Sequence, residues 1–497
     1  MFSINFLLSS KNNSYKFLDN MFYAKFKIYN KLVKHCKNLL KKLKNDSNYK
    51  ETLNKYIEAK KTKDSKLIKE LFKELNNIRF SYGLDQCSLE KYAKEQQKKY
   101  SKYISSQVCQ VIAKDIWVAV EKVLFSDGKQ IHFKKYNDIN TISAKSKSNG
   151  IVLKKVNNQY YIRINKLYIP IVFKDYDKEY TTETFKNNLK YCKIKRMQFN
   201  NGYRYYVQII FEGNSLKKYS KGEGTIGIDP GVSTIACTTN KSCILRDLAP
   251  NVSKYNKKIL EVQKQMERSL RINNKECFKS DGTIKKGIKL KKTKNYYKLN
   301  RIFRTLHRKR TTYMDECQYL LVRDIVKQGD SIYYEEMNFK ALQKRAKKTE
   351  RSEKSSEIKQ KDGSIKEVKK YKKKKRFGKS LNNKAPSAFL TKLTNKCKAL
   401  DIEIKKINTI TYKASQYNHI ENKYIKHELK DRFIQIGPYL VQRDLYSSFL
   451  LKYPNKDLKT TNRTLCLKHF EEFLKMHDEC INDIRVTVKN RPSSFGF

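Results

Sequence analysis

The stretch GTIGIDPGVSTIACTTN, residues 224–240, carries an apolar strand into one carboxylate, Asp229, and then turns at Pro230–Gly231. A charge at the end of an apolar strand raises the question of what that charge meets. An aspartate before Pro-Gly is, by itself, equally consistent with an ordinary turn residue. Segments farther along the chain bear on the choice between a turn residue and a functional acid.

Two later segments place an acid in a similar context. DSIYYEEMN, residues 330–338, is another short β-type run that reaches Glu335, and VQRDLYSSF, residues 441–449, has a helical apolar stripe with Asp444 beside it. The second segment also holds Ser447–Ser448, which are small enough to let a helix approach a sheet closely. Taken singly, Glu335 is consistent with an exposed strand end, and Asp444 with an acid that interacts with a helix dipole.

The order strand, strand, helix favours a joint interpretation of the three acids. Cleavage of a phosphodiester with divalent cations needs hard oxygen ligands, mostly carboxylates, that hold two Mg²⁺ ions about 4 Å apart. One ion activates a water molecule and the other stabilises the leaving oxygen. We therefore predict that Asp229, Glu335 and Asp444 converge on such a site.

The charge of the chain points to a polyanionic partner. Its 497 residues include 109 Lys and Arg against 49 Asp and Glu, a formal net charge of +60, and 39% of them are hydrophobic. This composition predicts a folded, basic protein of two or three domains that binds nucleic acid. Codon bias in an AT-rich genome is an alternative source of Lys, but biased Lys is usually balanced by Glu, and here it is not.

Hydrophobic periodicity divides the chain into three regions. Residues 1–130 are mainly helical with a basic outer face, and the first 20 or so residues are also assignable to the next region. Residues 131–220 alternate apolar and polar side chains, which predicts a small antiparallel sheet or barrel with a hairpin turn at Asn200–Gly202. Residues 221–497 begin with the strand quoted above.

Two parts of the third region are strongly basic. Residues 252–329 return to helical periodicity mixed with Lys, Arg and Tyr, which is consistent with either a solvated helix face or a surface that faces phosphates. Residues 340–380 hold 18 Lys and Arg against 5 Asp and Glu, with almost no apolar periodicity. We expect a mobile loop there, either a solvated linker or a clamp on the nucleic-acid backbone.

The cysteines do not predict a metal site. None of the eleven forms a C-x2-C pair. Cys466, His469, His477 and Cys480 are zinc-type ligands at regular spacing, but in one helix the two cysteines would lie about 21 Å apart. We expect an amphipathic helix there instead. The N-terminus lacks the pattern of a signal peptide and no run of about 18 apolar residues occurs, so we expect a cytoplasmic protein without a membrane partner.

The motifs resemble those of a known family. IGIDPG, IYYEEMN and QRDLYSS are similar to the three active-site motifs of the RuvC-type nuclease domain, an RNase H-like fold, in transposon-encoded TnpB proteins and in miniature type V CRISPR effectors of subtype V-F. Residues 380–419 resemble the segment before the target-strand-binding insertion of those proteins. The likeness covers residues 221–497; the earlier regions match only in order, as a helical recognition lobe and a β-barrel wedge domain.

This resemblance implies an α+β multidomain protein that acts as an RNA-guided, double-stranded DNA endonuclease. Asp229, Glu335 and Asp444 would be the catalytic carboxylates that bind two Mg²⁺ ions, with Glu336 as an adjacent alternative on the opposite face of its strand. Arg443 would contact substrate phosphate. The partners implied are a guide RNA, target double-stranded DNA and a second copy of the chain on the same guide.

The chain departs from the family pattern at two places. Tyr446 stands where the third motif usually has Asn, so hydrogen bonding around the metal site is expected to differ. The insertion at about residues 411–440 lacks the two C-x2-C pairs that bind zinc in relatives, and His419 with His427 cannot complete a tetrahedral site. We therefore predict no structural zinc and an insertion stabilised by Tyr and Phe packing.

Two alternatives to a CRISPR effector stay open. The nearest is a transposon-encoded TnpB nuclease guided by RNA from the end of its element. The other is a guide-dependent DNA-binding repressor that has lost cleavage, which would be expected to lack one of the three acids.

Overall fold

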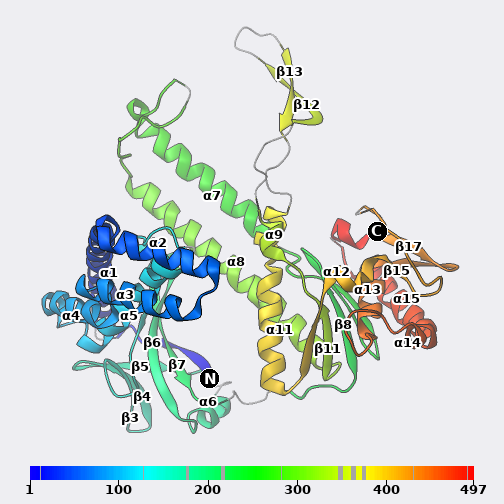
Figure 1. The fold of residues 1–497 in the computed structure, drawn as a ribbon, viewed down its shortest axis with the longest axis horizontal. Helices are drawn as coiled ribbons and strands as arrows, with labels where there is room; N and C mark the ends of the chain where they lie inside the picture. The colour runs from blue at the N-terminus through cyan, green and yellow to red at the C-terminus, as the bar shows by residue number, and fades with distance from the viewer. Residues whose placement is uncertain are drawn as a thin grey trace. The chain divides into compact units, whose positions relative to one another are not determined.

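A computed structural model describes the chain except residues 12, 127, 175–177, 214–218, 281, 345–350, 360–364, 372–376, 429 and 490. The fold is mixed α+β and comprises two compact units, Met1–Leu216 and Lys217–Phe497 (Figure 1). Among the described residues, no helix is both long enough and apolar enough to cross a membrane.

Four helices of the N-terminal unit begin at polar capping residues. The helices of this unit are α1 (Ser14–Asn45), α2 (Ser47–Thr62), α3 (Ser65–Ser81), α4 (Gln86–Gln97), α5 (Ser106–Phe125) and the short α6 (Lys178–Thr184). Asp46, Asp64, Asp85 and Ser105 precede α2 to α5, and each side chain accepts a backbone N–H of the first turn. These bonds satisfy donors that a helix start otherwise leaves free.

Seven antiparallel strands form the sheet of this unit, in the order β2-β6-β7-β1-β5-β4-β3. Their bounds are β1 (Phe2–Leu8), β2 (Thr141–Ser143), β3 (Ile151–Val156), β4 (Gln159–Ile164), β5 (Leu167–Val172), β6 (Leu189–Phe199) and β7 (Gly202–Phe211). Phe199 pairs with Gly202, so β6 and β7 turn at Asn200–Asn201, as the sequence predicts. The expected barrel is not closed by pairing of the edge strands β2 and β3 among the described residues.

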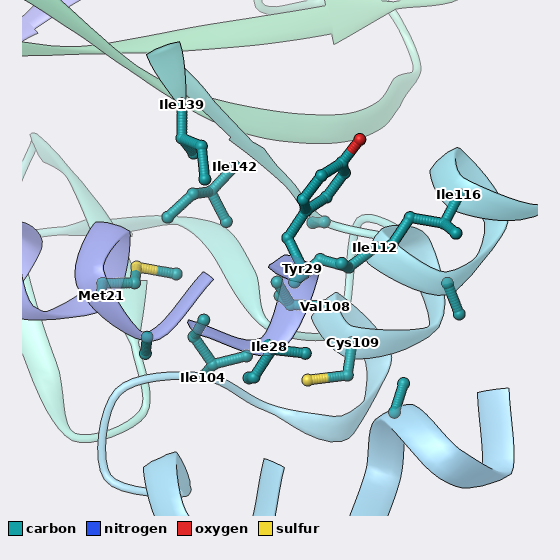
Figure 2. Packing of buried hydrophobic residues seen from close by; sticks show 14 of the residues in the cluster. Met21, Ile28, Tyr29, Ile104, Val108, Cys109, Ile112, Ile116, Ile139 and Ile142 are labelled. Carbon is teal, nitrogen blue, oxygen red and sulfur yellow. The ribbon is translucent and has the colours of Figure 1, made fainter. Parts of the chain in front are cut away.

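The helices and the sheet of this unit share one hydrophobic core. Figure 2 shows Met21, Ile28 and Tyr29 of α1 with Val108 and Ile112 of α5, with Ile142 of β2 and with Ile139 just before that strand. The predicted boundary at residue 130, between a helical region and a β-rich region, therefore does not separate two hydrophobic cores. The reason is that β1, at the start of the chain, pairs with β7 and β5, and α1 follows it directly.

The C-terminal unit is built on a five-stranded sheet in the order β10-β9-β8-β11-β14. The strands are β8 (Thr225–Pro230), β9 (Thr234–Thr238), β10 (Cys243–Asp247), β11 (Ser331–Glu335) and β14 (Glu403–Ile407). The first three are antiparallel to one another, and β11 is parallel to both β8 and β14.

Helices cover both faces of this sheet. Alternate residues Ile226 and Ile228 of β8 pack with α8 (Lys294–Val326) and α11 (Pro386–Leu400). The opposite face packs on α13 (Arg443–Lys452) and α15 (Phe470–Thr487), and α14 (Arg463–Lys468) precedes α15. Helix α7 (Val252–Ile272) lies along α8 (Figure 1).

The stretch that we expected to be a loop contains regular structure. After α9 (Phe339–Leu342), β12 (Arg351–Lys359) pairs with β13 (Ile365–Tyr371), and α10 (Gly378–Lys384) follows. These described residues therefore have regular structure where we expected none, and the mobility of the stretch stays a prediction; residues 345–350, 360–364 and 372–376 lie outside the described part. The loop prediction rested on the weak apolar periodicity, but the two strands form a two-stranded ribbon of their own, which needs little burial.

The predicted insertion consists of short elements. They are α12 (Thr409–Tyr412), β15 (Tyr417–Asn418), β16 (Lys423–Tyr424), β17 (Phe433–Ile436) and β18 (Tyr439–Gln442). Aromatic pairs hold them: Tyr417 contacts Tyr424, and Tyr439 contacts Phe470 of α15, with ring centroids 5.0 and 5.8 Å apart.

Candidate active site

Two of the three predicted acids stand side by side at the ends of parallel strands. Tyr334 of β11 is in register with Ile228 of β8, so the next residues, Glu335 and Asp229, are neighbours. Because side chains alternate along a strand, both acids lie on the sheet face opposite to Ile228 and Tyr334. That is the face on which α13 packs.

Helix α13 approaches β8 closely and brings the third acid. A Cβ atom on Gly227 would lie 2.0 Å from the Ser448 carbonyl oxygen, so only glycine fits there. The hydroxyls of Thr238 and Ser448 are 2.7 Å apart, and Lys452 Nζ donates to the Thr239 carbonyl at 3.0 Å. These contacts fix the helix on the sheet, with Asp444 in its first turn.

The charges of the three acids influence one another. The surrounding protein shields Asp229 from water and so raises its pKa well above the usual value. The charges of Glu335 and Asp444 raise this pKa further, and the positive charge of Arg443 lowers it. Burial likewise raises the pKa of Glu335 and of Asp444. Repulsion between converging carboxylates is what a cation or a shared proton would relieve.

Glu336, the alternative to Glu335, points elsewhere. Its carboxylate forms an exposed pair with Lys406 of β14 at 3.1 Å, whereas Glu335 is only 7% exposed. The hydroxyl of Thr409 donates to the Glu336 backbone carbonyl at 3.0 Å. It also lies beside the Glu335 carboxylate and keeps the pKa of Glu335 lower than burial alone would. The geometry favours Glu335 as the member of the site.

Arg443 is placed to hold Asp444. It is 8% exposed, its Nη1 donates to the Glu428 carbonyl at 3.0 Å, and its Nε lies 3.7 Å from Asp444 Oδ1. This placement argues against the predicted contact with substrate phosphate, because the guanidinium is buried among protein groups. Arg432, whose Nη1 lies 3.8 Å from Asp444 Oδ2, has the more exposed side chain, 29% against 9%.

The donor chemistry of the three acids fits Mg²⁺. Carboxylate oxygens are its usual protein ligands, and two strand ends and a helix supply rigid support. Among the described residues, however, no three His, Cys, Asp or Glu side chains gather closely enough to hold a metal ion. Binding would therefore require the side chains of Asp229, Glu335 and Asp444 to turn toward a common ion.

Tyr446 does not face the three acids. Its hydroxyl lies 2.7 Å from His419 Nδ1 and accepts the His419 backbone N–H, inside the aromatic core behind α13. Tyr446 thus links α13 to the insertion. His419 is fully buried, and burial lowers its pKa to about 4. That the insertion holds no structural zinc stays a prediction.

The segment with Cys466, His469, His477 and Cys480 is not the single helix that we predicted. It breaks at His469, whose ring stacks on Tyr453 and whose Nδ1 lies 3.0 Å from Glu472. These tertiary contacts override the continuous apolar period. Cys466 and His477 are both buried, on separate helices.

Sequence reasoning missed Gln442, Arg432 and Thr409. Gln442 caps α13, but glutamine is not a usual capping residue, so its position carried no signal. Arg432 and Thr409 reach the acids from the insertion and from the residues after β14, and only the fold brings them there. Arg432 could have been suspected from the basic character of the segment, but not assigned.

Comparisons with known proteins leave the family open. No known protein family and no curated protein matches the chain. Among solved structures, a chain of the assembly titled "Cryo-EM structure of CRISPR-Cas12f Ternary Complex" aligns with 92% of this chain and 99% of that chain, at 12% identity and a TM-score of 0.25. A TM-score of this size does not show a common overall fold.

Proposed function

We propose that the chain is an RNA-guided endonuclease that cuts double-stranded DNA with Mg²⁺ at one site, formed by Asp229, Glu335 and Asp444. The observation that carries this proposal is the placement of Asp229 and Glu335 at neighbouring strand ends, with Asp444 in the first turn of the helix that packs on the same face of the sheet. Structural carboxylates rarely crowd in this way, because each raises the cost of ionising the others.

The residues of the site would act through position and charge. When bound, Mg²⁺ ions would activate a water molecule and stabilise the leaving oxygen of a phosphodiester. Asp229 and Glu335 would hold the ions from the rigid sheet, and Asp444 from α13. Arg443 keeps Asp444 in place, and the more exposed Arg432 is the better candidate for contacting substrate phosphate.

The guide RNA and the target DNA enter the proposal from sequence. The motifs IGIDPG, IYYEEMN and QRDLYSS resemble those of RuvC-type guided nucleases, and a net charge of +60 suits a partner with many phosphates. Base pairing by the guide would select the sequence, while the protein holds the backbone of the RNA–DNA duplex. Two copies on one guide are part of the same proposal.

Sequencing the RNA that copurifies with the protein, expressed with its native flanking DNA, tests the guide. Repeat-derived RNA joined to varied spacers is expected and identifies a CRISPR effector. RNA from one transposon end would assign the chain to the TnpB class, and the absence of enriched RNA would contradict a guided nuclease.

Cleavage by the resulting complex tests the site. The complex is given Mg²⁺ and DNA that matches its RNA, and Asp229→Ala is compared with the native chain. The variant is expected to lose cleavage while it retains RNA and DNA binding. Cleavage that survives in Asp229→Ala would show that the site is misassigned, and no cleavage by the native chain would favour a repressor.

A further inference from the structure

We propose that His477 is a positioning residue of the candidate active site: its neutral imidazole fixes Gln442, the residue that starts α13 and orients Asp444. The inference rests on the proposed function and adds to it a residue of α15, bonded to the residue that precedes α13. His477 lies on α15 and is 2% exposed.

The hydrogen bonds of His477 define its tautomer. The Gln442 backbone N–H donates to His477 Nε2 at 2.9 Å, so Nε2 must carry a lone pair. The hydrogen of the neutral ring is therefore on Nδ1, which donates to Asp478 Oδ1 at 2.8 Å. Asp478 thus selects the tautomer that accepts from Gln442.

Among the described strands, none accepts the Gln442 backbone N–H, which donates to His477 instead. In the pairing of β17 with β18, the next residue, Arg443, donates its N–H to the Arg432 carbonyl at 2.8 Å. Successive N–H groups of a strand point to opposite sides, so the Gln442 N–H points away from β17 and toward α15. Without His477, this fully buried donor would be left unpaired.

Gln442 connects this bond to Asp444. Its Oε1 accepts the Leu445 N–H at 2.8 Å and so caps α13 one residue on from the acid. Its side chain also lies near enough to Asp444 to lower the pKa of that carboxyl, although its amide nitrogen does not meet hydrogen-bond geometry. Because the Tyr446 hydroxyl is bonded to His419, Tyr446 does not orient Asp444, and this role falls to Gln442.

The inference can be tested with His477→Leu, His477→Gln and Ile484→Ala in the full-length chain bound to its copurified RNA. Leu removes the acceptor but keeps the volume, and the Gln carbonyl can accept the same N–H. Ile484 is also a buried residue of α15, so its truncation supplies a matched loss of stability. Cutting of matched DNA is measured at saturating DNA, together with DNA affinity and the thermal midpoint.

His477→Leu is expected to slow cutting about 10- to 100-fold with unchanged DNA affinity, the range typical of residues that orient metal ligands. His477→Gln is expected to restore the rate to within about threefold. Ile484→Ala should lower the thermal midpoint without slowing the cut. The proposal is overturned if His477→Leu cuts as fast as Ile484→Ala, or if His477→Gln is as slow as His477→Leu.

A second measurement does not depend on cleavage. In protein labelled with ¹⁵N at histidine, NMR should show His477, identified by its loss in His477→Gln, as the neutral form protonated at Nδ1. A form protonated at Nε2 excludes the bond to Gln442 and overturns the proposal even if the protein cuts DNA. If the native chain cuts nothing, the proposed function and this role fall together, and the NMR result shows whether the hydrogen bond itself stands.

Discussion

At the scale of single residues, the placement of Glu335 and Glu336 separates a site acid from its neighbour. Both carboxylates belong to the same end of β11, but one is buried next to Asp229 and the other pairs with Lys406 in solvent. The alternation of a strand produces this difference without any difference in chemistry between the two side chains.

Glu335→Gln is expected to reduce Mg²⁺-dependent cutting about 1,000-fold, because loss of a ligand charge removes several kcal/mol of transition-state stabilisation. Glu336→Gln, the matched control, should cut within about threefold of the native rate, since an exposed ion pair contributes little. Cleavage assays of both variants decide the matter. Equal losses in the two would contradict the assignment of Glu335.

Ionised Asp229 should lower the free energy of unfolding when no metal is bound. Its pKa is higher in the folded than in the unfolded state, so the folded chain binds the proton more tightly, and ionisation near pH 7 destabilises it. Asp229→Asn is therefore expected to raise the thermal midpoint in a chelator. Mg²⁺ should raise the midpoint of the native chain and have a smaller effect on the variant. Equal Mg²⁺ effects on both proteins would argue that the ion binds elsewhere.

At the scale of elements, the contact between α13 and β8 sets the geometry of the site. Gly227 lets the helix backbone touch the strand, and Thr238 and Lys452 bond across the same contact. The position of Asp444 over the sheet therefore depends on the close contact between α13 and Gly227, which lies two residues before Asp229 in β8.

Gly227→Ala is expected to destabilise the chain by about 3 kcal/mol or more, because its Cβ would overlap helix backbone that no rotamer change can move. Cutting should fall with it, since α13 must shift. Ile226→Val, at the adjacent buried position, should cost about 1 kcal/mol and leave the cutting rate unchanged. Thermal unfolding and cleavage assays test both; a fully active Gly227→Ala would show that α13 is free to move.

The link between the insertion and α13 should be sensitive to acid. The pKa of His419 is about 4 in the folded state against 6.5 ordinarily, so below pH 6.5 the unfolded chain binds the proton more tightly. Stability should therefore fall as the pH drops from 6.5 toward 4, by an amount on the order of 3 kcal/mol. His419→Gln should flatten this dependence in denaturant unfolding at several pH values. An unchanged pH profile would rule out His419 as its source.

At the scale of the whole molecule, charge rather than shape is the property open to prediction. With a net charge of +60, binding of the guide and its DNA duplex should release many counterions. If about 15 phosphates are neutralised, the logarithm of affinity should fall with the logarithm of salt concentration with a slope near −13. Filter binding or fluorescence anisotropy across a salt series measures it. A slope of only a few units would mean that most of the Lys and Arg face solvent without a partner.

The sequence by itself determined the site acids as candidates, the hairpin at Asn200–Asn201 and the mixed α+β composition, and it predicts a polyanionic partner. These features depend on residue type and on local period, which a chain carries along its length. Tertiary structure was needed to choose Glu335 over Glu336, because both residues follow the same strand pattern. Only the neighbouring strand and the packed helix show which face of β11 carries the site.

Tertiary structure alone also decided the hydrogen-bond partners of Arg443, Gln442 and His477. Each has a partner outside its own element: Arg443 donates to the Glu428 carbonyl, and Gln442 and His477 are 35 positions apart. A hydrogen bond between such residues leaves no periodic trace in sequence. The break at His469 and the single core shared by the N-terminal helices and sheet have the same origin. Local sequence pattern predicts which side chains are buried or paired with a charge, and the tertiary structure determines the partner of each.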